Sequence, residues 1–279
     1  MKRVVSLLIL VTLTVTLSMA QKTIAVQRNG EAAFYTEWAQ AWSNTQAGDT
    51  LYLPGGTFII GDLDIDKPVT IIGVGHDTAS IHDRLYSNLN GNLRLITGSD
   101  GTHLHGFAVN NLNIGTSGTN DNVADLHISR CRIRGTCTLG ATSPSPAQQI
   151  FIDESVLNSI QGQNARHVFF TKCIITGTVI SFNQNVTFVN NIFTHNYYYL
   201  YQVTNTLFRN NIFRFGGYPS EPWVTTSHNN LFEYNIFVAN LSIDPQTDLN
   251  TWENNFFNQP LESIFVQYLD EGFSSRNDF

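Results

Sequence analysis

The sequence predicts an all-β solenoid, a fold in which short parallel strands stack coil upon coil along a single axis. The main observation is a phrase written four times, as Asn190-Asn191-Ile192-Phe193, Asn210-Asn211-Ile212-Phe213, Tyr234-Asn235-Ile236-Phe237 and Asn254-Asn255-Phe256-Phe257. Successive copies lie 20, 24 and 20 residues apart, and repeats of that length are typical of solenoids. A second observation is that charged residues make up only 13% of the chain. Stacked strands tolerate like amides above one another better than like charges.

Less similar copies of this four-residue sequence occur upstream. When all copies are aligned, residues at the same position of the repeat form columns. The last apolar position gives a column of Val109, Ile133, Leu157, Ile175, Phe193, Phe213, Phe237 and Phe257. Five residues upstream, a second apolar column consists of Leu104, Ile128, Ile152, Phe170, Phe188, Phe208, Phe232 and Trp252. Each coil is therefore predicted to contain two short strands that meet at a bend, which excludes a helical solenoid.

Two columns of polar residues mark the bends. The first consists of Cys131, Ser155, Cys173, Asn191, Asn211, Asn235 and Asn255. We interpret its asparagines as a structural ladder, in which each amide bonds to the next coil and its backbone adopts the left-handed conformation of a tight bend. The alternative is a row of amides that bind a ligand. The second column consists of Asn185, Asn205 and Asn229, with His167 one coil earlier, so we interpret His167 as a turn residue rather than a catalytic one.

Residues 1–20 have the features of a secretory signal peptide. Lys2 and Arg3 precede an apolar run, and Ser18 and Ala20 supply small residues at the cleavage positions. We expect a mature chain that starts at Gln21, has no membrane span, and is secreted or located at the cell surface or in the periplasm. An uncleaved anchor is the alternative, which the short and interrupted apolar run disfavours.

Residues 30–45 are predicted to form a helix, because Phe34, Trp38, Ala41 and Trp42 follow helical spacing. The first coil of a solenoid exposes apolar side chains and unpaired backbone groups. An amphipathic helix in front of it is expected to cap that open end.

Two phrases after this helix carry a family resemblance. They are Gly48-Asp49-Thr50-Leu51, which leads into Pro54-Gly55-Gly56, and Asp66-Lys67-Pro68-Val69-Thr70-Ile71-Ile72-Gly73. They resemble the opening turns of the pectin-lyase-like right-handed parallel β-helix superfamily. The resemblance implies that residues 21–279 form one right-handed parallel β-helix domain, with the asparagine column as its internal ladder. No capping pattern follows Phe257, so either the tail covers the last coil or the C-terminal cap is missing and the natural chain continues.

The composition restricts the class of partner. The net charge is −7, and the low content of basic residues argues against nucleic-acid binding. The resemblance implies extracellular polysaccharide as the partner, and we expect a monomer. Three cysteines, Cys131, Cys137 and Cys173, are an odd number for an exported protein. Cys131 and Cys173 lie two coils apart, roughly 9 to 10 Å, which is too far for a disulfide, so we interpret both as small buried residues and leave Cys137 open.

Catalytic residues are harder to assign. The resembled family contains lyases, hydrolases and proteins without known activity, so the fold alone does not imply an enzyme. A lyase needs a base beside the uronate α-proton, and a glycosidase needs two carboxyl groups about 5 to 10 Å apart. The candidates are Lys172, His195 and Glu221. However, Lys172 shares a column with Arg130 and Glu154, and an alternating-charge ladder accounts for all three.

The pattern of Arg209 and Glu233 also indicates a surface ion pair. No carboxylates have the spacing of calcium ligands, so no metal site is predicted and calcium is implied by the resemblance only. The Arg-x-Pro-x-x-Arg pattern of pectate lyases is absent, which disfavours a calcium-dependent lyase of that type. Two long loops are expected, from Gly135 to Gln148 and from Arg214 to His228.

Aromatic residues give the best candidates for substrate binding. They gather in one coil and the next loop, as Tyr197, Tyr199, Tyr201, Tyr218 and Trp223. Rings of this kind stack on sugars, although they are equally suited to packing a loop onto the wall. Two hypotheses remain: a polysaccharide lyase or glycoside hydrolase that acts on uronate-containing glycans, or a non-catalytic, adhesin-like surface module.

Overall fold

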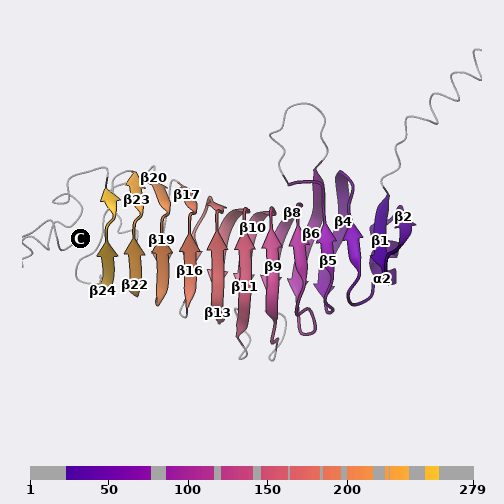
Figure 1. Cartoon of the computed structure of the whole chain (residues 1–279), viewed down its shortest axis with the longest axis horizontal. Coiled ribbons are helices and arrows are strands. Elements are labelled where there is room, and N and C mark those ends of the chain that lie inside the picture. The colour runs from indigo at the N-terminus through magenta and orange to yellow at the C-terminus, as the bar shows by residue number, and fades with distance from the viewer. Residues whose placement is uncertain are drawn as a thin grey trace, which may run out of the picture.

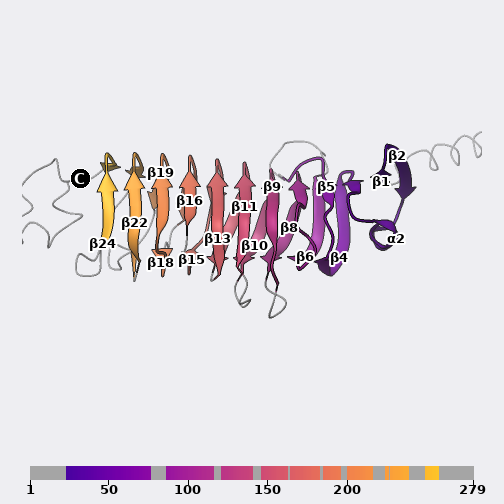
Figure 2. The same cartoon turned by 60° about the horizontal axis from the view of Figure 1, so that its bottom comes forward.

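The computed structural model describes residues 23–76, 86–115, 121–140, 146–162, 164–182, 185–195, 200–215, 224–225, 227–238 and 249–257. These residues form a rod of stacked coils (Figure 1). Its walls are two long sheets, called sheet A and sheet B. Their coil strands are parallel and follow one another along the axis (Figure 2). The predicted parallel β-helix is therefore confirmed. The predicted signal peptide and residues 258–279 lie outside the described part of the chain.

Sheet A contains β1 (Ile24–Arg28), β2 (Glu31–Tyr35), β3 (Thr50–Tyr52), β5 (Thr70–Ile72), β7 (His103–His105), β9 (Ala124–Ser129), β11 (Ala147–Asp153), β13 (Ala165–Thr171), β16 (Val186–Val189), β19 (Thr206–Arg209), β22 (His228–Glu233) and β24 (Leu249–Glu253). Sheet B contains β4 (Gly56–Ile65), β6 (Ser87–Leu95), β8 (Ala108–Ile114), β10 (Arg132–Leu139), β12 (Val156–Gly162), β14 (Ile174–Ile175), β17 (Ile192–His195), β20 (Ile212–Phe215), β23 (Ile236–Val238) and β25 (Phe256–Phe257). Three short strands, β15 (Val179–Ile180), β18 (Leu200–Tyr201) and β21 (Val224–Thr225), continue from β12 beside this path.

The register of the strands confirms both apolar columns. In sheet B, Phe193 pairs with Phe213, which pairs with Phe237. In sheet A, Phe208 pairs with Phe188 on one side and with Phe232 on the other. Because successive side chains of a strand point to opposite faces, both columns point inward and fill the core.

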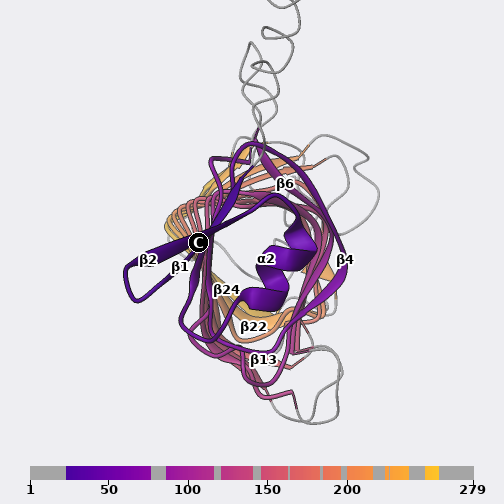
Figure 3. The same ribbon diagram turned by 90° about the vertical axis from the view of Figure 1, so that its right-hand side faces the viewer.

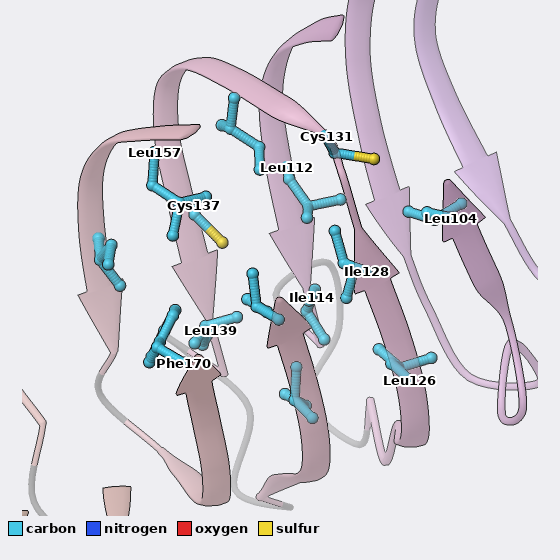
Figure 4. Packing of buried hydrophobic residues seen from close by; sticks show 14 of the residues in the cluster. Leu104, Leu112, Ile114, Leu126, Ile128, Cys131, Cys137, Leu139, Leu157 and Phe170 are labelled. Carbon is cyan, nitrogen blue, oxygen red and sulfur yellow. The ribbon is translucent and has the colours of Figure 1, made fainter. Parts of the chain in front are cut away.

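The core of the earlier coils is mainly aliphatic and contains the three cysteines. Figure 4 shows Cys131 and Cys137 among buried leucines and isoleucines. All three cysteines are free and buried, as expected for Cys131 and Cys173. Burial raises the pKa of the Cys137 thiol to about 12. It therefore stays protonated and acts as a small apolar side chain.

Asparagine side chains bond along the axis inside the first bend. Asn211 N donates to Asn235 Oδ1 (2.9 Å), and Asn211 Nδ2 donates to Phe188 O (2.9 Å) and Asn235 Oδ1 (3.0 Å). Asn191 bonds to Asn211 in the same way, as Asn235 does to Asn255. Each side-chain amide therefore satisfies two backbone groups of the preceding coil, and its nitrogen also donates to the amide oxygen of the next coil.

The prediction for the left-handed backbone at this bend was wrong by one residue. Positive φ angles occur at the preceding position, occupied by Arg130, Glu154, Lys172, Asn190, Asn210, Tyr234 and Asn254. The left-handed residue turns the chain, and the following side chain then points into the core. At the second bend the prediction is confirmed, because His167, Asn185, Asn205 and Asn229 all have positive φ.

The predicted helix over residues 30–45 is wrong in its first half. Asn29 and Gly30, at φ 51° and 87°, form the turn of a hairpin, and Glu31–Tyr35 pairs antiparallel with β1. Asn-Gly between two strands is a strong hairpin signal, and it outweighs the helical spacing of Phe34, which is 69% exposed. Only α2 (Trp38–Asn44) is helical. It lies across the N-terminal end of the coils (Figure 3) and buries Trp38 and Ala41.

The predicted loop from Gly135 to Gln148 is also shorter than expected, because β10 continues to Leu139 and β11 begins at Ala147. A β-bulge in β10 lets the strand continue past Gly135 in register with both neighbours.

In the described residues, the helix α2 is too short to cross a membrane.

Candidate functional site

A groove lies on the outer face of sheet B and encloses about 530 Å³. The residues that line it are Tyr86, Arg132, Ile133, Arg134, Val156, Asn158 and Thr176. Arg132 and Arg134 project from β10 because they flank Ile133, which belongs to an inward column. The inward column thus places two arginines side by side on the outer surface.

Arg134 is held in place by neutral partners. Its Nη2 donates to the Tyr86 hydroxyl (2.9 Å), and its Nη1 donates to Asn88 Oδ1 (2.8 Å) and, more weakly, to Asn110 Oδ1 (3.5 Å). The guanidinium carbon also lies 5.7 Å from the centre of the Tyr86 ring. These contacts fix the orientation of the guanidinium without cancelling its charge.

Four other arginines of the described chain contact carboxylates, whereas the partners given above for Arg134 are neutral. Arg28 contacts Asp49, Arg94 contacts Asp64, Arg130 contacts Glu154 and Arg209 contacts Glu233. None of the described residues that line the groove carries a carboxylate. The Arg134 guanidinium therefore brings a positive charge with neutral partners to the groove, on a chain whose net charge is −7.

The outer face of sheet B becomes apolar beyond the groove. Val156 is in register with Arg132, and the same row continues as Ile174, Ile192, Ile212, Ile236 and Phe256. The isoleucines of this row are 37% to 41% exposed. One face of the rod thus presents a cationic, amide-rich part followed by a narrow apolar row.

The outer face of sheet A has a column of rings, formed by His103, His127, Phe151 and Phe169. Their centroids are 4.7, 4.8 and 5.2 Å apart, with interplanar angles of 3°, 16° and 6°. Neighbouring rings cover one another's faces, so mainly ring edges face the solvent. This column is therefore a poor surface for stacking sugars, which need an open ring face.

The structure places Lys172 in the alternating-charge ladder rather than in the groove. Lys172 Nζ lies 3.8 Å from Glu154 Oε1, and Arg130 Nε lies 2.8 Å from Glu154 Oε2. The hydrogen bond from Arg130 holds the pKa of Glu154 below its usual value. The predicted ladder is confirmed, as is the ion pair of Arg209 with Glu233.

The other predicted site residues are not brought together by the described part of the chain. His195 ends β17 and Tyr201 ends β18, but their side chains lie outside the description. Tyr197, Tyr199, Tyr218, Glu221 and Trp223 lie outside the described residues altogether. The predicted aromatic site therefore stays a prediction.

Sequence reasoning missed the arginine groove. The signal was present, since placing Ile133 in an inward column means that Arg132 and Arg134 point outward together. Tyr86 gave no such signal, because it lies 48 residues from Arg134 in the sequence. Only the stacking of coils brings the two side chains into contact.

Calcium, which the resemblance implies, binds six to eight oxygen ligands that include carboxylates. Within the described ranges, no group of three or more His, Cys, Asp or Glu side chains is placed to hold a metal ion. The groove itself is lined by two arginines. It does not fit a calcium ion.

No protein-family model matches the chain, and no curated protein matches it. Among solved structures, the crystal structure of the pectin methylesterase from Aspergillus niger in deglycosylated form is similar to this chain. The match has 12% sequence identity and a TM-score of 0.39, and it covers 85% of this chain and 92% of the other. The strand order and register of this chain themselves show its fold, which is a parallel β-helix.

Proposed function

We propose that this protein binds acidic polysaccharide outside the cell, with the groove on sheet B as the site for a uronate carboxylate. The observation that carries the proposal is Arg134, which is fixed by a hydroxyl and two amide oxygens and stands beside Arg132. A carboxylate is the partner that a guanidinium with neutral neighbours binds best, because the hydrogen bonds are charge-assisted.

The rest of the groove suits a sugar. Asn158 and Thr176 line it and offer donors and acceptors for hydroxyl groups. Val156, in the same groove, offers an apolar contact for the carbon face of a ring. Coils repeat every 4.7 to 4.9 Å or so along the axis, so a polymer that lies along the rod meets similar groups at regular steps.

Of the two hypotheses from the sequence, binding without catalysis is the better supported. A hydrolase needs paired carboxyl groups, and the described lining of the groove contains none. A lyase is the second candidate, because two neighbouring arginines are suited to stabilising the enolate that forms when the α-proton is removed.

The test is binding of an oligogalacturonate, measured by titration calorimetry, beside a neutral xylan oligomer. Arg134→Gln is expected to weaken oligogalacturonate binding about 10- to 100-fold, since a hydrogen bond to a charged group contributes about 1.5 to 3 kcal/mol. The matched control is Arg94→Gln on the same sheet. Arg94 Nε already contacts Asp64 Oδ1 at 2.5 Å, so this variant should bind oligogalacturonate as the parent chain does.

Equal binding of the neutral oligomer, or no loss in the Arg134→Gln variant, would overturn the proposal. A parallel assay for ultraviolet absorbance of unsaturated uronate separates the two candidates. A rise that Arg134→Gln abolishes identifies a lyase. Binding without any rise supports the non-catalytic module.

A further inference from the structure

A second polar cluster lies on the outer face of sheet A, on a different wall from the groove. His105 on β7, Ser129 on β9 and Asp153 on β11 occupy one row, in register from coil to coil. They point outward because the neighbouring Leu104, Ile128 and Ile152 belong to the inward column. All three polar residues are half-buried.

Ser129 and His105 are in direct contact, since Ser129 Oγ lies 2.7 Å from His105 Nδ1. This is the spacing of a serine nucleophile and its general base. The backbone of Ser129 is fixed within the sheet, and its carbonyl accepts a hydrogen bond from Gly106 N at 3.1 Å. The serine is thus presented from a rigid strand, which keeps its geometry defined before any ligand arrives.

Ser155 shows by contrast what a structural serine looks like in this fold. Its side chain is only 1% exposed, its Oγ donates to Asp153 O at 2.8 Å, and it accepts from Cys131 N at 3.0 Å. Ser155 therefore satisfies backbone groups inside the bend. Ser129 faces outward and bonds to an imidazole instead.

The order of the row determines the role of Asp153. Ser129 lies between His105 and Asp153, so Asp153 does not hold the far side of the imidazole as the acid of a catalytic triad does. Its carboxylate is still close enough to interact electrostatically with His105 and His127. Asp153 thus contributes a negative charge near the dyad without orienting the imidazole.

We propose that Ser129 and His105 form an acyl-transfer dyad that acts on small esters of the acetyl class. Ser129 Oγ bonds to the ester carbonyl carbon while its proton moves to His105 Nδ1. The bond from that carbon to the leaving alcohol then breaks, and the alcohol oxygen takes the proton from His105. Water attacks the acyl serine, gives a proton to His105, and the acid leaves as Ser129 recovers its proton.

The size limit follows from the neighbours of the dyad on the same face. His127 and Phe151 precede Ser129 and Asp153 by two residues on their strands and stack at 4.8 Å. Because these rings occupy the surface beside the dyad, we expect it to accept small acyl groups such as acetyl rather than long acyl chains.

The test is covalent labelling of the folded full chain with a fluorophosphonate, read by peptide mass spectrometry. We expect one dominant adduct on Ser129, none in Ser129→Ala, and a labelling rate at least about 100-fold lower in His105→Gln. Glutamine keeps a hydrogen-bond acceptor for the serine but cannot act as a base. Ser43→Ala is the control, because Ser43 is exposed and bonds only locally to Gln40 O.

Hydrolysis of p-nitrophenyl acetate should fall in parallel with labelling, while the thermal midpoint of His105→Gln stays near that of the parent chain. An adduct spread over several exposed serines would overturn the dyad. So would a His105→Gln variant that is folded and labels at the parent rate.

Discussion

The coils from Cys131 to Cys173, called the early coils, and those that follow, called the late coils, solve the same packing problem with different side chains. At the first bend, the coils at Cys131, Ser155 and Cys173 use thiols and a hydroxyl, whereas later coils use asparagines. The inward columns change over the same stretch, from leucine and isoleucine to phenylalanine. The later coils therefore consist of stacks of flat groups, amides and rings, that repeat at the spacing of the coils.

The difference shows how repetition replaces interlocking packing. In sheet A, rings from Phe170 to Trp252 stack with centroids 4.6, 5.0, 4.6 and 4.1 Å apart. These distances are close to the spacing of neighbouring strands, so each ring rests on the next without displacing its coil. Aliphatic residues have no flat face and fill space by shape instead. The late coils are thus stabilised by the stacking of like side chains from coil to coil, and the early coils by side chains that fill the available volume.

The largest effect is expected from breaking the amide ladder at Asn211, which is 1% exposed. Asn211→Ala removes the acceptor of Asn191 N and the donor to Phe188 O. Each buried backbone group left without a partner costs about 1 to 3 kcal/mol. We expect the free energy of unfolding to fall by about 2 to 5 kcal/mol, measured by urea denaturation.

The matched variant in the early coils is Ser155→Ala, which orphans Cys131 N and removes one of two donors to Asp153 O, whose carbonyl keeps Arg130 N. It should cost about half as much. If both variants lose the same free energy, the late coils gain nothing from amides, and the comparison between the two regions fails.

The next effect concerns the rings. Phe208→Leu keeps the site apolar but removes stacking on Phe188 and Phe232. Two lost ring pairs at about 0.5 to 1.5 kcal/mol each, with a small residual cavity, predict a loss of about 2 to 3 kcal/mol in unfolding free energy.

The control for the ring stack is Ile152→Leu, an isomeric exchange in the same column that should cost less than about 1.5 kcal/mol. Thermal unfolding followed by near-ultraviolet circular dichroism would measure both, and would also report the loss of ring order. An Ile152→Leu variant as damaged as Phe208→Leu would mean that shape governs both regions alike.

The columns of this fold were predictable because, in a repeat of about 20 residues, the members of each column occupy equivalent positions of successive repeats. The same frame places His105 and Ser129 in one row, so their contact also follows from the alignment of coils. The left-handed position was missed because the repeated phrase has two adjacent asparagines, and either can adopt a positive φ. The hairpin at Asn29 and Gly30 was missed because helical spacing was weighed above a turn signal.

The candidate site was less predictable than the fold. Arg132 and Arg134 follow from the column of Ile133, but the orientation of Arg134 depends on Tyr86, Asn88 and Asn110, which belong to earlier coils. Long-range contacts of this kind depend on how loops and bulges align neighbouring coils, and a repeat pattern does not record them.

The smallest effect is expected at the exposed ladder of Arg130, Glu154 and Lys172, which lies next to the buried polar column. Lys172→Gln removes an ion pair of 3.8 Å whose lysine side chain is 65% exposed. Exposed pairs contribute about 0.2 to 1 kcal/mol and are screened by salt, so urea denaturation should show a loss in that range that disappears at 1 M salt or so. Acid should also destabilise the fold. The pKa of Glu154 is lower in the folded chain than in the unfolded chain, so the ionised carboxylate stabilises the fold at pH values above its unfolded pKa. This stabilisation is lost as the pH falls through the lowered pKa. A loss as large as that of Asn211→Ala would show that charge, rather than stacked amides, holds this edge of the rod.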